Sequence, residues 1–157
     1  MSERPTIRMR PVTMGDSATL LRWQQQTSTR RYFRNPAIPG EDAHAAWFEK
    51  RFADKRGLFE IILADDEPVG MIRFDSLAPK ADGVFDVSIL IDENARGRGL
   101  AAAALNMTKD RLPVAELRAE VHPDNTTSHK LFRKCGFVEC PGGYIYFSPT
   151  KNKDSSR

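Results

Sequence analysis

Apolar and polar residues follow two different periods along the chain, and together they predict a domain of mixed strands and helices. Alternation at every second residue and short apolar runs indicate strands, whereas apolar residues spaced three and four apart indicate helices. The predicted strands cover about 7–12, 59–64, 69–74, 84–91, 117–121, 137–139 and 144–147. The predicted helices begin near Asp16 and Glu41, span 100–112, and run from Asp124 or Asn125 to Gly136. The resulting order of elements is β-α-α-β-β-β-α-β-α-β-β.

The most informative segment is the turn between the strand at 84–91 and the helix at 100–112. Its sequence, Arg96-Gly97-Arg98-Gly99-Leu100-Ala101, combines two arginines with glycines that leave backbone N–H groups accessible. A helix that begins at such a turn offers unpaired N–H groups and a partial positive charge, which suit a phosphate. The turn matches neither the P-loop nor the Rossmann pattern, because Gly-Lys-Ser/Thr is absent and a third glycine is missing. A phosphate-bearing ligand of another kind is therefore expected here.

Two motifs together resemble those of the GNAT superfamily of N-acetyltransferases. The turn fits R/Q-x-x-G-x-G/A at Arg96, Gly99 and Ala101, and residues 125–137 fit N-x-x-S/A-x-x-L-Y/F-x-K-x-G-F. The resemblance implies an α/β GNAT fold, with a mixed central sheet, helices on both faces and a splayed strand pair at an acetyl-CoA site. A single domain is expected over 1–150, and the charge-rich segment 151–157 is expected to be a disordered polar tail.

The resemblance also implies which residues hold acetyl-CoA. Backbone groups of Leu90 and Ile91 would pair with the pantetheine arm and hold the thioester oxygen, and the turn at 96–101 would hold the pyrophosphate. Asn125 would contact pantetheine or a water, or cap the helix, and both roles can hold. The full set expected to bind acetyl-CoA is Leu90, Ile91, Arg96, Gly97, Arg98, Gly99, Leu100, Ala101, Asn125, Ser128, Phe132 and Lys134.

Three residues are candidates for catalysis by the same resemblance. Asp86 lies where many relatives carry a Glu that faces the acceptor amine, so it either accepts the amine proton or only attracts the cationic amine. Glu60, on a neighbouring strand, is a second candidate base. Phe132 stands where many relatives have a Tyr that protonates the leaving thiolate, and phenylalanine cannot donate a proton. Ser128 could supply a hydroxyl instead, or it could satisfy a backbone group.

The N-terminal half resembles a branch that acetylates nucleotide-linked amino sugars, of the pseudaminic acid pathway type. The resemblance lies in Glu41–Phe48 and Pro68–Asp75. It implies that the acceptor is bound by Trp23, His44, Trp47 and Arg73. The expected reaction is acetyl transfer from acetyl-CoA to the amine of such a sugar, by direct attack. Two alternatives stay open: acetylation of the N-terminus of a ribosomal or other protein, and a non-catalytic domain that senses acetyl-CoA.

Composition narrows the remaining choices. The chain has 157 residues, which suits one domain, and its net charge of +3 is spread without a basic stripe, so nucleic acid is not expected. His44, His122 and His129 lack metal-ligand spacing, so no metal is expected. The sequence shows no signal peptide or membrane span, and its two cysteines suit a reducing, cytoplasmic setting. We expect a monomer or homodimer that acts on a small-molecule amine.

Overall fold

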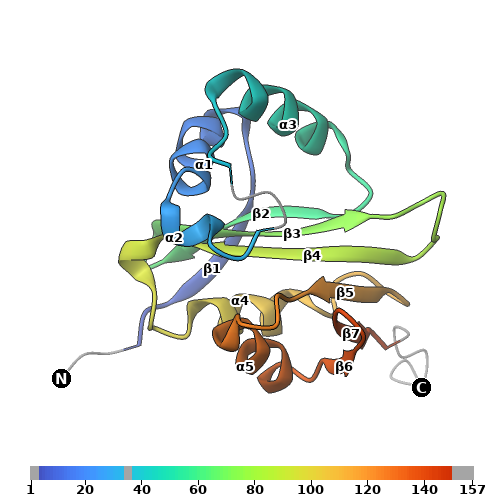
Figure 1. Ribbon diagram of the computed structural model, residues 1–157. Helices are drawn as coiled ribbons and strands as arrows, with labels where there is room; N and C mark the ends of the chain where they lie inside the picture. Colours follow the sequence, from blue (N-terminus) through green and yellow to red (C-terminus); the bar gives the residue numbers. More distant parts are fainter. Residues whose placement is uncertain (1–3, 34–36, 150–157) are drawn as a thin grey trace.

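The computed structural model of the protein describes residues 4–33 and 37–149, which form a seven-stranded sheet flanked by helices (Figure 1). The strands are β1 (Ile7–Pro11), β2 (Leu58–Ala64), β3 (Glu67–Ser76), β4 (Val84–Ile91), β5 (Glu116–Glu120), β6 (Val138–Cys140) and β7 (Gly143–Phe147). The helices are α1 (Ser17–Gln24), α2 (Thr27–Arg30), α3 (Glu41–Ala53), α4 (Leu100–Thr108) and α5 (Thr126–Lys134), with single 3-10 turns η1 (Met14–Asp16) and η2 (Glu93–Ala95). The polar tail expected over 151–157 lies outside the described residues. No helix within the described ranges has the length and apolar character to cross a membrane.

The sheet is mixed, with the strand order β1-β2-β3-β4-β5-β7-β6. The neighbours β4 and β5 are parallel, and all other neighbouring strands are antiparallel. Figure 1 shows α1 and α3 on one face of the sheet and α4 and α5 on the other. This arrangement confirms the predicted mixed sheet with helices on both faces and, apart from the short helix α2, the predicted order of elements.

Side chains on the two faces of the sheet pack into two separate hydrophobic cores, because neighbouring residues of a strand point to opposite faces. The core on the side of α4 and α5 includes Ile72, Val87, Leu105, Leu117 and Phe132. The core on the side of α1 and α3 includes Leu20, Trp23, Phe48, Met71 and Leu90. The even-numbered residues of β4 between 86 and 90 therefore share the α3 face of the sheet.

Two helices differ from the sequence-based expectation. The helix expected to reach residue 112 ends at Thr108, whose hydroxyl donates a hydrogen bond to the carbonyl oxygen of Ala104 (2.8 Å). Leu112, which precedes Pro113 and is disfavoured in the helical conformation, lies outside the helix. The short helix α2 was not expected, since a single turn of polar residues carries no apolar period.

The parallel strands β4 and β5 part after three paired residues. Their pairing covers Val84–Asp86 of β4 and Glu116–Arg118 of β5, whereas the pairing of β4 with β3 continues to Ile91. Beyond Asp86 the edge of β4 that faces β5 therefore opens into a groove. The splayed strand pair implied by the sequence resemblance is present.

The close approach of β3 to β4 depends on Gly70, which lies opposite Ile91. A Cβ atom built at Gly70 would lie 2.3 Å from the carbonyl oxygen of Leu90. We predict that Gly70→Ala lowers the free energy of unfolding by about 1–3 kcal/mol, the usual cost of overpacking, because β4 must shift. Urea unfolding measures the change. Gly15→Ala is the matched control, since its Cβ meets only ordinary contact, at 3.6 Å from the Thr13 hydroxyl; equal losses in the two variants would contradict the prediction.

Candidate active site

A cavity of about 1890 Å³ opens where β4 and β5 part. Its walls come from β4, the turn before α4, β5, the start of α5, helix α3 and the segment that follows α1. The predicted site residues that line it are His44, Trp47, Arg73, Asp86, Leu90, Ile91, Arg96, Gly97, Gly99, Leu100, Ala101, Asn125, Ser128 and Phe132. One cavity thus brings together residues expected to serve the cofactor, the chemistry and the acceptor.

The glycine turn before α4 has the geometry expected of an anion cradle. Gly97 and Gly99 have φ angles of +81° and +72°, which side-chain-bearing residues rarely adopt. Gly99 is the N-cap of α4, and its carbonyl oxygen accepts the hydrogen bond from the N–H of Ala103 (3.1 Å). The N–H groups of the first helical turn therefore point along the helix axis into the cavity region, where they suit a phosphate.

Arg96 is held at the edge of this turn by two hydrogen bonds. Its Nε donates to the carbonyl oxygen of Ile91 (3.3 Å), and its Nη2 donates to the hydroxyl of Thr29 (3.1 Å). The guanidinium keeps further donors for an anion, because it carries five N–H groups. Arg98 and Lys134, also expected to bind the cofactor, are exposed and lie outside the cavity wall.

The start of α5 forms the opposite wall of the groove. Asn125 caps this helix, because its Oδ1 accepts the N–H of Ser128 (3.2 Å). Phe132 is buried, with its ring centroid 5.1 Å from that of Phe137 and 5.8 Å from that of Tyr144. The hydroxyl-bearing residues of this wall include Ser128 and Tyr144, and the Tyr144 hydroxyl lies 2.7 Å from His129 Nδ1.

Asp86 occupies the closed end of the groove. It is the last residue of β4 that pairs with β5, opposite Arg118, and it lies opposite Asp75 on β3. Its side chain is exposed and lines the cavity. The guanidinium of Arg118 is itself paired with Glu116. A carboxylate therefore stands at the point where the two strands begin to part.

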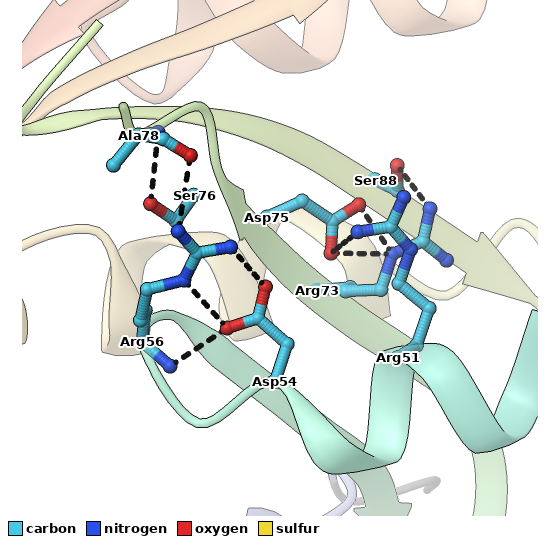
Figure 2. A network of polar contacts seen from close by, with 8 residues as sticks. All are labelled: Arg51, Asp54, Arg56, Arg73, Asp75, Ser76, Ala78 and Ser88. Carbon is cyan, nitrogen blue, oxygen red and sulfur yellow. Dashed lines mark hydrogen bonds and ion pairs between the residues drawn. The ribbon is translucent and has the colours of Figure 1, made fainter. Parts of the chain in front are cut away.

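A half-buried network of polar contacts joins Arg73, which lines the cavity, to Asp75, Ser88 and Arg51 (Figure 2). Arg73 Nε donates to both carboxylate oxygens of Asp75 (2.7 and 2.9 Å), and its Nη2 donates to the hydroxyl of Ser88 (3.2 Å). Arg51, from α3, approaches the same carboxylate at 3.6 Å. The pKa of Arg73 is lowered, because the effect of burial exceeds the opposing effect of the charges of Asp75 and Asp86.

Trp47 and Arg73, both expected to bind the acceptor, lie against each other in the cavity wall. The guanidinium carbon of Arg73 lies 5.0 Å from the centroid of the Trp47 ring, within the range of a cation–π contact. The edge of Trp47 also meets the ring of Phe59, at a centroid distance of 6.0 Å. The indole is half-buried, so part of its surface remains accessible from the cavity.

Glu60, expected as a second candidate base, lies outside the cavity that Asp86 lines. Its carboxylate accepts two hydrogen bonds from Arg111 (2.6 and 2.7 Å) and borders a separate cavity of about 310 Å³. Burial raises the pKa of Glu60, and the charge of Arg111 opposes that shift. Glu60 lies opposite Ile72, whose side chain belongs to the α4 face. Since Asp86 is on the α3 face, the two carboxylates lie on opposite sides of the sheet.

Two of the expected acceptor residues serve the packing instead. Trp23 is fully buried in the core under α1 and α3 and does not line the cavity, so the structure does not bring it together with the other residues expected to bind the acceptor. His44 lines the cavity but is buried, and its Nε2 donates to the carbonyl oxygen of Ser17 (3.0 Å), which ties α3 to α1. Burial lowers the pKa of His44, so the neutral ring is favoured.

Sequence reasoning missed four residues that shape the site: Arg51, Asp75, Ser88 and Thr29. The two-residue period of the strands could have found two of them, since Ser88 shares a face with Asp86 and Asp75 shares one with Arg73. Arg51 and Thr29 reach the site from helices whose docking no local pattern indicates.

Comparison with known proteins agrees with this geometry. The acetyltransferase (GNAT) domain family matches residues 6–138. Among solved structures, spermidine N-acetyltransferase from Vibrio cholerae, in complex with CoA and spermine, is 16% identical, with a TM-score of 0.73 over 90% of this chain and 92% of that chain. An acetyltransferase from Thermus thermophilus is 24% identical, with a TM-score of 0.72 over 93% and 97%. RimJ from Mycobacterium smegmatis, in complex with CoA-disulfide, is 22% identical, with a TM-score of 0.69 over 90% and 81%.

At such low identities, these structures support the fold alone. No curated protein matches the chain at a significant level. The family match covers most of the sequence and both motifs. The chain therefore belongs to the GNAT family of acetyltransferases.

Proposed function

We propose that the protein transfers the acetyl group of acetyl-CoA to the primary amine of a nucleotide-linked amino sugar, by direct attack with Asp86 as the base. The observation that carries this proposal is the position of Asp86, at the point where β4 leaves β5 and within the same cavity as the glycine turn. A carboxylate at the closed end and an anion cradle at the open end suit a long cofactor whose reactive thioester and phosphates lie far apart.

The groove itself would polarise the thioester. Of Leu90 and Ile91, only Ile91 has backbone groups on the β5 side, because the N–H of Asp92, which lies two residues after Leu90, donates to Val69 of β3 (2.8 Å). The N–H of Ile91 would hold the pantetheine arm or the thioester oxygen. A preorganised donor of this kind is worth about 10²–10³ in rate where it has been removed from other enzymes. Leu90 itself pairs with Met71 of β3, and its side chain packs in the core on the α3 face.

Asp86 would remove a proton from the acceptor amine, directly or through a water, since it is a short carboxylate. The CoA thiolate would leave as the anion, because a thiol with a pKa of about 8.5 is a tolerable leaving group. Ser128 lines the wall beside Phe132, so its hydroxyl would stabilise that anion in place of the missing phenol.

The cavity wall supports an anionic sugar nucleotide as the acceptor. Trp47 offers a partly accessible aromatic surface of the kind that stacks on sugars. The cavity wall includes five arginines and two carboxylates: Arg30, Arg31, Arg73, Arg96, Arg118, Asp86 and Glu120. Arginines favour a diphosphate, whereas a polyamine would favour a wall dominated by carboxylates. A protein N-terminus is the alternative, in view of the fold shared with RimJ.

We predict that Gly99→Asp raises the Kd for acetyl-CoA by about tenfold or more, since a loss of about 1.4 kcal/mol is a factor of ten. The new carboxylate would stand against the phosphates, in a backbone conformation that suits glycine. Calorimetry measures the affinity. Gly83→Asp is the control, because Gly83 also has a positive φ (+75°) but lies outside the cavity. A parental Kd in Gly99→Asp would show that the cofactor binds elsewhere.

Asp86→Asn is predicted to lower kcat by about 10²–10⁴, the range for a lost general base, with little change in acetyl-CoA affinity. Steady-state assays of CoA thiol release across pH measure the effect. Glu60→Gln is the control and should keep kcat near the parental value, because Glu60 faces the other side of the sheet. If Asp86→Asn kept the parental kcat at every pH, Asp86 would have no part in proton transfer.

Nucleotide-linked amino sugars are predicted to be acetylated faster than spermidine or short peptides that begin with Ser or Ala. The arginines of the cavity wall would hold the diphosphate that only the sugar nucleotides carry. Thiol release from acetyl-CoA is compared across this panel at equal acceptor concentrations. Faster turnover of the peptides would support N-terminal acetylation instead. Binding of acetyl-CoA with no thiol release for any amine would identify a sensor domain.

A further inference from the structure

The segment Gln26–Tyr32, here called the strap, is attached to the end of β4. The Gln26 side chain donates to Asp92 Oδ1 (2.9 Å) and accepts the backbone N–H of Glu93 (3.0 Å). The Ser28 hydroxyl donates to the carboxylate of Glu93 (2.9 Å). These bonds join residues that are more than 60 positions apart in the sequence, so they fix the strap against the loop that leads into the glycine turn.

One more bond extends this attachment into the turn itself. Arg96 donates to the hydroxyl of Thr29 (3.1 Å), which lies at the centre of the strap. Both residues line the large cavity. The strap is therefore secured along the β4 side of the groove, next to the place proposed for the cofactor phosphates.

The end of the strap reaches the other side of the groove. The ring of Tyr32 lies against the ring of His122, with a centroid distance of 5.3 Å and an angle of 34° between the planes. His122 follows the end of β5, and its Nδ1 accepts the backbone N–H of Asp124 (3.1 Å), which orients the imidazole. Tyr32 and His122 both line the cavity.

The contact between Tyr32 and His122 spans the groove, because the strap is bonded to the segment after β4 and His122 lies in the segment after β5. The strap is bonded beyond the end of β4, and His122 is carried beyond the end of β5, whereas β4 and β5 pair only as far as Asp86 and Arg118. A bridge between the two diverged ends must cross the space between them. The pantetheine arm, on the proposed function, lies in that space.

We propose that Tyr32 and His122 form a clasp that closes the groove over the pantetheine arm, so that CoA enters and leaves only when the two rings separate. The proposal rests on the proposed function, since it takes CoA as the molecule in the groove. The clasp acts as a barrier to passage and not as a further contact for the cofactor. A barrier slows binding and release alike, whereas a lost contact raises the rate of release alone.

The test measures the association and dissociation rate constants of CoA by stopped-flow mixing and displacement, in the full chain. Tyr32→Ala and His122→Ala are each expected to raise both rate constants by about two- to tenfold, the range set by the loss of one aromatic pair, with a smaller change in Kd. Tyr32→Phe is the matched control and should keep the parental rates, because it retains the ring. The double variant should match the single variants, since either change opens the clasp.

Three results would overturn the clasp: parental rates in either alanine variant, a rise in the dissociation rate constant alone, or additive effects in the double variant. The side chain of Tyr32 is half-buried and that of His122 is exposed, so these substitutions leave the cores intact. Faster CoA exchange in the variants of a chain that never transfers acetyl would support the clasp and overturn the proposed function. Parental exchange rates in variants of an active acetyltransferase would overturn the clasp alone.

Discussion

The divergence of β4 from β5 after Asp86 is the constraint on which the rest of the molecule depends. The N–H and C=O groups of a strand inside a sheet normally form hydrogen bonds with the neighbouring strand. Leaving such groups buried without a partner costs free energy. Here the pairing with β5 ends at Asp86, while pairing with β3 holds β4 straight to Ile91. The sheet therefore keeps its continuity on one side and presents a row of backbone groups on the other. The anion cradle, the cap of α5 and Asp86 all take their places around that opening.

The two faces of the sheet differ in polarity. On the α4 face the strands carry mainly apolar residues, and the Glu60–Arg111 pair closes the end of that core. On the α3 face the apolar core includes Met71 of β3 and Leu90 of β4, and the next positions on this face are the polar residues Arg73, Asp75 and Ser88. A buried ion pair adds little net stability, because desolvation offsets the attraction. Its structural effect is to fix Arg73 against Trp47, which gives the cavity a rigid polar floor.

The sequence predicted the order of the elements, apart from the short helix α2, and the glycine turn and helix cap that border the groove, because those features are local. A glycine turn, a helix cap and an apolar strand each leave a signature within a short stretch of chain, as Gly99 and Asn125 illustrate. The structure brings only some of the residues expected at the acceptor site into the cavity wall, because that wall is assembled by helix docking. Trp23 and Trp47 look alike in the sequence, yet one fills the core and the other lines the cavity. Glu60 and Asp86 differ in the face of the sheet on which they lie, and only the register between β2, β3 and β4 decides that.

Successive side chains of β4 point to opposite faces of the sheet, so the number of residues in the strand decides which side chains face the cavity. Residues of β4 at an even distance along the chain from Asp86, the last residue paired with β5, lie on the same face as Asp86. Residues at an odd distance lie on the opposite face. Insertion of one residue within the strand would exchange the faces, turning Asp86 toward the apolar core and Val87 toward the cavity. Insertion of two would restore the faces but displace the carboxylate along the groove by about 7 Å. Length changes should therefore be confined to the connection between β3 and β4, because β4 itself sets the distance between Asp86 and the glycine turn.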